Sequence, residues 1–99
     1  MFATVREVTY DPEQLRRGQA PLEEFAALRA RQPGYAGSLT VDAGGGRTFT
    51  LTLWESEAQA EAALAVLDPE AQRLMGPLWS APMRVLGRGA VLRSDLVKS

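Results

Sequence analysis

Two extended segments joined by three consecutive glycines constrain the fold of this chain more than any other feature. Residues 47–54 alternate strictly, with threonines and a tryptophan on one side and phenylalanine and leucines on the other. Residues 35–41 alternate in the same way, and a period of two is typical of β-strands. The glycines at 44–46 provide the backbone freedom that a hairpin loop needs. The sequence therefore predicts an antiparallel hairpin over residues 35–54.

The segment before this hairpin is typical of one strand followed by helix. Residues 2–10 mix β-branched and aromatic side chains with polar ones and contain no helix breaker. Asp11 and Pro12 form a typical helix start, with an N-cap carboxylate and a proline in the first turn. After this short turn, apolar residues spaced three and four apart predict a longer amphipathic helix over 21–32.

The segment after the hairpin repeats the helix-then-strand order. Ser56 and Gln59 have the spacing of a capping box and predict the start of a helix. Pro69 follows an aspartate, and this pair predicts that a separate short helix starts there. A last strand is expected over 83–92, where Gly87 and Gly89 indicate a bulge or bend.

The resulting order, β-α-β-β-α-β, is that of an α+β, ferredoxin-like domain. We expect a four-stranded antiparallel sheet with both helices on one face. A chain of 99 residues has room for one such domain, spanning 1–99, and the polar residues 94–99 are expected to form a flexible tail.

The two faces of the predicted sheet differ in chemistry. Apolar content indicates that the helices cover the face bearing Ala3, Val5, Leu39, Val41, Phe49, Leu51 and Leu53. The other face then carries Thr4, Arg6, Ser38, Thr40, Thr50, Thr52 and Trp54. Either this polar face is exposed to water, or it closes against a second copy of the chain and encloses a hydroxyl-lined cavity. The second arrangement would also protect a bare sheet from aggregation.

Composition excludes several classes of function. The chain has no histidine and no cysteine, which disfavours transition-metal, zinc and haem sites and removes disulfides and thiol catalysis. A net charge of −1 without a basic run argues against nucleic-acid binding. No apolar stretch reaches the length of a membrane span, and no signal-peptide pattern opens the chain, so we expect a cytoplasmic protein.

Two short motifs resemble those of the antibiotic-biosynthesis monooxygenase family. Residues 33–38, Pro-Gly-Tyr-Ala-Gly-Ser, match a Pro-Gly-aromatic-x-Gly segment that enters the second strand in that family. Residues 54–58, Trp-Glu-Ser-Glu-Ala, match the end of the third strand and the start of the next helix. With this spacing and element order, the resemblance covers about residues 2–92. The motif residues have plain structural roles as well, in turns and helix capping.

The resemblance implies a homodimeric α/β barrel and, for some members, oxygenation of aromatic substrates without metal or flavin. It therefore predicts a cofactor-free enzyme whose partner is a second copy of the chain and whose ligand is a small aromatic molecule. Members that degrade haem need an asparagine, a tryptophan and a histidine at positions that hold Arg6, Ala63 and Arg73 here. These three differences disfavour haem degradation.

Five residues are candidates for substrate binding: Arg6, Thr52, Trp54, Trp79 and Arg84. The arginines would stabilise a substrate anion, and the tryptophans would stack on an aromatic ring. Each also has a structural explanation, since strand arginines often face solvent and Trp79 follows apolar residues typical of a core or dimer contact. A tyrosine, Tyr10 or Tyr35, could exchange protons. No general base is recognisable, so the catalytic residues are unknown.

Two function hypotheses follow. The first is a monooxygenase-like enzyme acting on a small aromatic or quinol-type substrate. The second is a non-catalytic ligand-binding or interaction module of the same fold, which the lack of an acid–base pair favours. An RNA-recognition module is disfavoured because threonines occupy the strand positions where aromatic residues would stack on bases.

Overall fold

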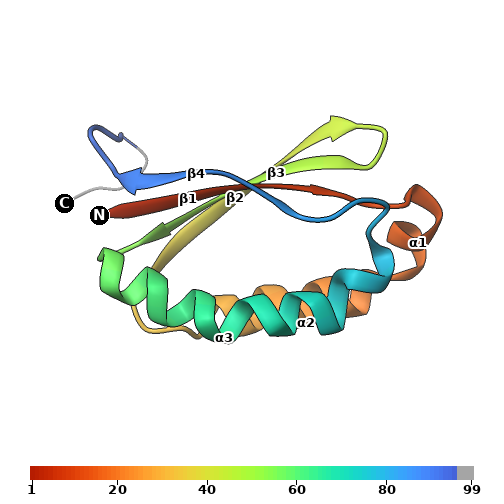
Figure 1. The fold of residues 1–99 in the computed structure, drawn as a ribbon, viewed down its shortest axis with the longest axis horizontal. Helices are drawn as coiled ribbons and strands as arrows, with labels where there is room; N and C mark the ends of the chain where they lie inside the picture. The colour runs from red at the N-terminus through yellow and green to blue at the C-terminus, as the bar shows by residue number, and fades with distance from the viewer. Residues whose placement is uncertain (96–99) are drawn as a thin grey trace.

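A computed structural model describes residues 1–95 and contains the predicted order of elements. Within that range the elements are β1 (Phe2–Thr9), α1 (Pro12–Arg17), α2 (Gln19–Ala30), β2 (Tyr35–Gly44), β3 (Arg47–Trp54), α3 (Glu57–Met75), the 3-10 turn η1 (Gly76–Leu78) and β4 (Arg84–Ala90). The strands form one antiparallel sheet in the order β2-β3-β1-β4. Helices α2 and α3 lie together on one face of this sheet (Figure 1). The ferredoxin-like β-α-β-β-α-β arrangement is confirmed.

Helix starts follow the predicted capping chemistry. The carboxylate of Asp11 accepts hydrogen bonds from the backbone N–H groups of Glu13 and Gln14 at the start of α1. The hydroxyl of Ser56 accepts from the N–H of Gln59 at 3.2 Å at the start of α3. Each bond satisfies a donor that the first helical turn leaves unpaired.

Helix α3 differs from the sequence prediction because it does not end before Pro69. It continues from Glu57 to Met75 as one helix with Pro69 inside it. Proline removes one hydrogen bond and disfavours the helical conformation of the residue before it. Burial of Leu67, Ala71 and Met75 on the same side of the helix outweighs that local cost.

The last strand is shorter than predicted, and it contains the expected irregularity. Its pairing with β1 shifts register between Val5 and Arg6, because Gly87 pairs with Val5 whereas Val85 pairs with Arg6. Of the expected flexible tail, residues 96–99 lie outside the described part of the chain. Within residues 1–95, no helix is both long and apolar enough to span a bilayer.

The assignment of the two sheet faces from apolar content is wrong. The face under α2 and α3 is the polar one, so its threonines and Arg6 lie beneath the helices. Among residues 1–95 no helix covers the apolar face, and on it Leu39 and Val41 remain 53% and 49% exposed, whereas Leu53 is buried. The polar face can lie under a helix layer because the two layers do not pack against each other along their whole length.

The contacts between the layers gather at the two ends of the sheet. At one end, Phe2 and Trp54 pack with Phe25 in a cluster that continues along α3 as far as Met75. At the other end, Val8 and Tyr10 pack with Leu78. The strand register places Arg6, Thr50 and Thr52 between these two clusters. The fold thus leaves the middle of the polar face free of close packing.

Candidate ligand-binding cavity

A cavity of about 310 Å³ lies between the sheet and the helices, over the middle of the polar face. Its floor carries the threonines Thr4, Thr40, Thr48, Thr50 and Thr52. Its helix-side wall is mainly apolar and includes Leu22, Phe25, Leu64, Leu67, Ala71 and Met75. Thr40 is exposed, so the cavity meets solvent beside the edge strand β2. One wall therefore offers hydroxyls and the opposite wall offers an apolar surface.

Trp54 lines the cavity at the end where β3 runs into α3. Its side chain is fully buried, and its ring meets that of Tyr35 edge to face at 5.9 Å. No acceptor among residues 1–95 receives a hydrogen bond from its indole N–H. This N–H has almost no accessible surface, and a buried donor without a partner is uncommon and costs free energy.

Arg6 lies on the central strand β1 and reaches toward α3. Its guanidinium donates to the Asp68 carboxylate at 2.6 Å and contacts the sulfur of Met83 at 3.5 Å. The side chain is only 17% exposed, and the pairing holds its charge in place at the cavity wall.

Tyr10 lines the cavity at the opposite end from Trp54. Its hydroxyl donates only to the Met75 sulfur, at 3.7 Å, which is a weak acceptor. Burial raises the pKa of the Tyr10 phenol above its ordinary value of 10.0. The phenol is therefore protonated at neutral pH and acts as a hydrogen-bond donor rather than as a base.

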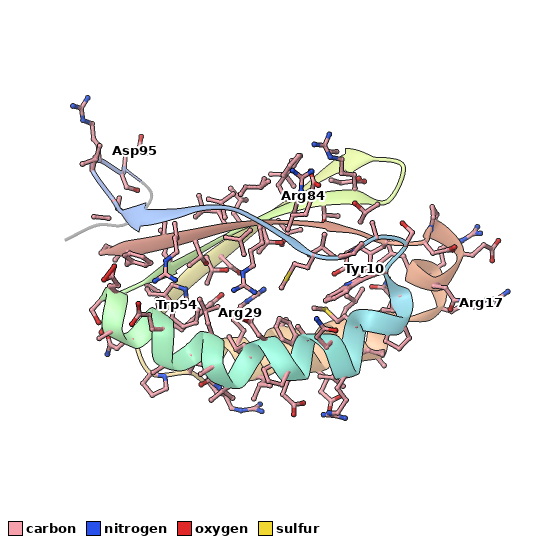
Figure 2. All side chains as sticks on the ribbon, in the orientation of Figure 1. Tyr10, Arg17, Arg29, Trp54, Arg84 and Asp95 are labelled. Carbon is pink, nitrogen blue, oxygen red and sulfur yellow. The ribbon has the colours of Figure 1, made fainter. Side chains whose placement is uncertain are left out.

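Arg29 is a wall residue that the strand-based reasoning missed. It lies on α2 and extends into the space between the layers, near Trp54 in the view of Figure 2. Its guanidinium donates to the Ser38 hydroxyl at 3.2 Å and lies over the Phe25 ring at 5.8 Å. The signal was present in the sequence, because Arg29 follows Leu22 and Phe25 at helical spacings of seven and four and so falls on the buried stripe.

The cavity brings together three of the five candidate binding residues. Arg6, Thr52 and Trp54 all lie on its wall. Trp79 packs against both core clusters instead, next to the backbone of Tyr10. Arg84 points away from the helices on the uncovered face and contacts Glu7 at 3.4 Å (Figure 2).

The groups on the wall are biased toward hydrogen-bond donors. Arg6, Arg29 and Tyr10 carry N–H or O–H groups, whereas the cavity lining contains no carboxylate among residues 1–95. Within the same residues, no cluster of three or more acidic groups could hold a metal ion. The arrangement suits an aromatic molecule that carries oxygen acceptors.

Comparisons with known proteins agree on the fold. Neither a scan of protein-family models nor a search of curated proteins finds a match. Among solved structures, a mutant of SnoaB, a cofactor-independent oxygenase from Streptomyces nogalater, is similar with a TM-score of 0.72 and 18% identity over 95% of both chains. Rv0793 from Mycobacterium tuberculosis gives a TM-score of 0.73 and 15% identity, covering 95% of this chain and 97% of that one.

A further structure is named directly as an antibiotic biosynthesis monooxygenase. It covers 87% of this chain and 94% of its own length, with a TM-score of 0.70 and 13% identity. The chain has the fold of the antibiotic-biosynthesis monooxygenases. Identities at this level establish the shared fold, so the activity has to be argued from the cavity of this chain.

Proposed function

We propose that this protein is a cofactor-independent monooxygenase acting on a small aromatic or quinol-type substrate in the cavity between its sheet and helices. The observation that carries the proposal is the cavity itself, in which an apolar wall faces hydroxyl and guanidinium donors. The fold shared with SnoaB, an oxygenase that uses no cofactor, supports the same reaction class.

The size of the cavity suits a ligand of two or three fused rings. A site of roughly 150 Å³ accepts benzene, and binding sites for small molecules begin at about 300 Å³. At about 310 Å³, this cavity is about twice the size of the benzene site. The Trp54 ring and the leucines of the helix wall would contact the faces and edges of such a ligand, and the threonines would meet its oxygens.

An electron-rich ring can supply the electrons for this reaction. In an anthrol-type substrate, one oxygen atom of O₂ becomes a ring carbonyl. The ring loses two hydrogens, which leave with the second oxygen atom as water, so atoms and electrons balance. The guanidinium of Arg6, held by Asp68 at 2.6 Å, would stabilise the anionic form of the substrate that reacts with O₂. The apolar wall would limit access of water.

The proposal is tested by incubating the purified protein under oxygen with a panel of naphthol- and anthrol-type quinols. We expect oxygen uptake above the uncatalysed rate and a product in which one labelled atom from ¹⁸O₂ is incorporated. Arg6→Gln should lower the rate, while Arg16→Gln, an exposed arginine of α1, should leave it unchanged. No uptake above background across the panel would contradict the proposal.

The second candidate function is ligand binding without catalysis. It is favoured by the cavity wall itself, where residues 1–95 place no carboxylate and where the Tyr10 phenol is protonated. Without a base on the wall, substrate deprotonation would depend on the substrate's own acidity. Thermal stabilisation of the protein by members of the same panel, without oxygen uptake, would favour this function.

We also propose that two copies of the chain pair through the uncovered sheet face. Leu39 and Val41 are about half exposed there, next to Phe49 and Leu51 of β3. A contiguous apolar surface on a small protein is usually covered by a partner, and identical surfaces pair about a twofold axis. The sequence pattern suggests pairing through the polar face instead, but the helices of the same chain cover that face.

A further inference from the structure

We propose that Arg29 binds a carboxylate that the ligand carries on its aromatic ring system. This inference rests on the proposed use of the cavity for an aromatic ligand. It goes further by naming the charge of the ligand and the side chain that selects for it. It does not depend on whether the bound molecule is oxygenated.

Arg29 differs from the other arginine on the cavity wall in its charge balance. Arg6 is neutralised by Asp68 at 2.6 Å, whereas Arg29 forms no salt bridge with any carboxylate of residues 1–95. Its polar partner there is the uncharged hydroxyl of Ser38, and its other close contact is the Phe25 ring. One positive charge on the wall is therefore left without a counter-charge.

The burial of Arg29 makes this unpaired charge significant. The side chain is half-buried between the layers, and its Nε has no acceptor among residues 1–95. A guanidinium in such surroundings gains more from a carboxylate than an exposed one does, because water competes less for its N–H groups. The Nε itself has almost no accessible surface, so the two terminal Nη groups, one of which also donates to Ser38, form the fork that a carboxylate accepts with both oxygens.

A second donor on the wall suits the same ligand chemistry. The Tyr10 hydroxyl donates to the Met75 sulfur at 3.7 Å, which is a weak acceptor. A neutral hydrocarbon would leave this donor without a stronger acceptor. A ring system bearing a phenolic or carbonyl oxygen as well as a carboxylate would supply one.

The inference is tested with two ligands that differ in charge and hardly in shape. Calorimetry would measure the binding of 2-naphthoate and of its neutral amide to the unmodified chain, to Arg29→Gln and to Arg29→Lys. Arg31→Gln is the matched control, because this exposed arginine lies two residues away and outside the cavity lining. Circular dichroism would check that each variant is folded.

We expect 2-naphthoate to bind the unmodified chain about tenfold more tightly than the amide, in line with one charge-assisted pair. Arg29→Gln should remove that preference while changing amide binding by less than about twofold, and Arg29→Lys should keep part of it. Arg31→Gln should have no effect. Equal binding of the two ligands by the unmodified chain, or an equal loss in the Arg29 and Arg31 variants, would overturn the inference.

Two further results separate this inference from the proposed oxygenase function. Preference for the carboxylate without oxygen uptake from any quinol would support the inference and contradict the oxygenase. Failure of both naphthalene ligands to bind at millimolar concentration would overturn the inference, while oxygen uptake from neutral quinols would still support the oxygenase.

Discussion

Tyr10 is a buried tyrosine whose phenol has a higher pKa than that of a surface tyrosine. It is almost fully buried, and its hydroxyl lies near a sulfur rather than near water. Burial raises its pKa because the ionised phenolate would lose hydration that the cavity wall does not replace.

This raised pKa predicts a loss of stability in alkali. The folded state holds the phenolic proton more tightly than the unfolded state, where the pKa is about 10. The contribution to stability is therefore fully present below about pH 10 and falls as the pH rises toward the folded value. Denaturant unfolding at about pH 8 and about pH 11 should show a larger loss for the unmodified chain than for Tyr10→Phe. Equal losses would show that Tyr10 is not protected from ionisation.

Strand alternation was enough to group some of the cavity residues correctly. Arg6, Thr52 and Trp54 share a face whichever side the helices cover, because side chains two apart in a strand point the same way. Alternation does not predict the face of Arg84, because the bulge in the pairing of β1 with β4 reverses which side chains of β4 point toward the helices. The place of Trp79 depends on η1 and the following loop, which have no periodic signal.

At the scale of elements, the order of strands and helices can be predicted from local sequence. The face of the sheet that the helices cover cannot. Apolar content usually indicates the covered face. Here the covered face forms the floor of a cavity, where hydroxyls replace the usual packing side chains. Likewise, Pro69 predicted a break from local conformation alone, while tertiary burial of α3 keeps the helix continuous.

The junction between β2 and α3 gives an element-scale prediction. Gly34 has φ of +84°, its carbonyl accepts from the Glu55 N–H at 2.8 Å, and a Cβ added to it would lie 2.7 Å from the Cβ of Gln59. Gly34→Ala should therefore lower the free energy of unfolding by about 1–2 kcal/mol through backbone strain and by about 1–3 kcal/mol more through overpacking.

Gly44→Ala is the matched control for this junction. Gly44 has a similar positive φ, of +91°, but a Cβ there would have no atom within 4 Å. This variant should lose only the stability that backbone strain removes. Chemical denaturation measures both losses, and a Gly44→Ala variant at least as destabilised as Gly34→Ala would show that the contact with α3 is unimportant.

At the scale of the whole molecule, the uncovered apolar face predicts self-association. Light scattering should give a mass about twice the 10.7 kDa of one chain at micromolar concentration. Val41→Glu should shift the mass toward that of a single chain, because a carboxylate would be buried in the interface. Val66→Glu is a matched control, since Val66 is 48% exposed on α3 against 49% for Val41. A single-chain mass for the unmodified protein would contradict the pairing.

The central claim is that a small aromatic ligand binds between the sheet and the helices, and the two tryptophans allow a direct measurement. Trp54 lines the cavity and Trp79 does not, so each indole N–H reports on a different place. In a ¹⁵N NMR titration with 1-naphthol, assigned with Trp79→Phe, we predict a saturable shift of the Trp54 indole signal and a much smaller one for Trp79. A titration that leaves the Trp54 signal in place, or that shifts only Trp79, would contradict the account.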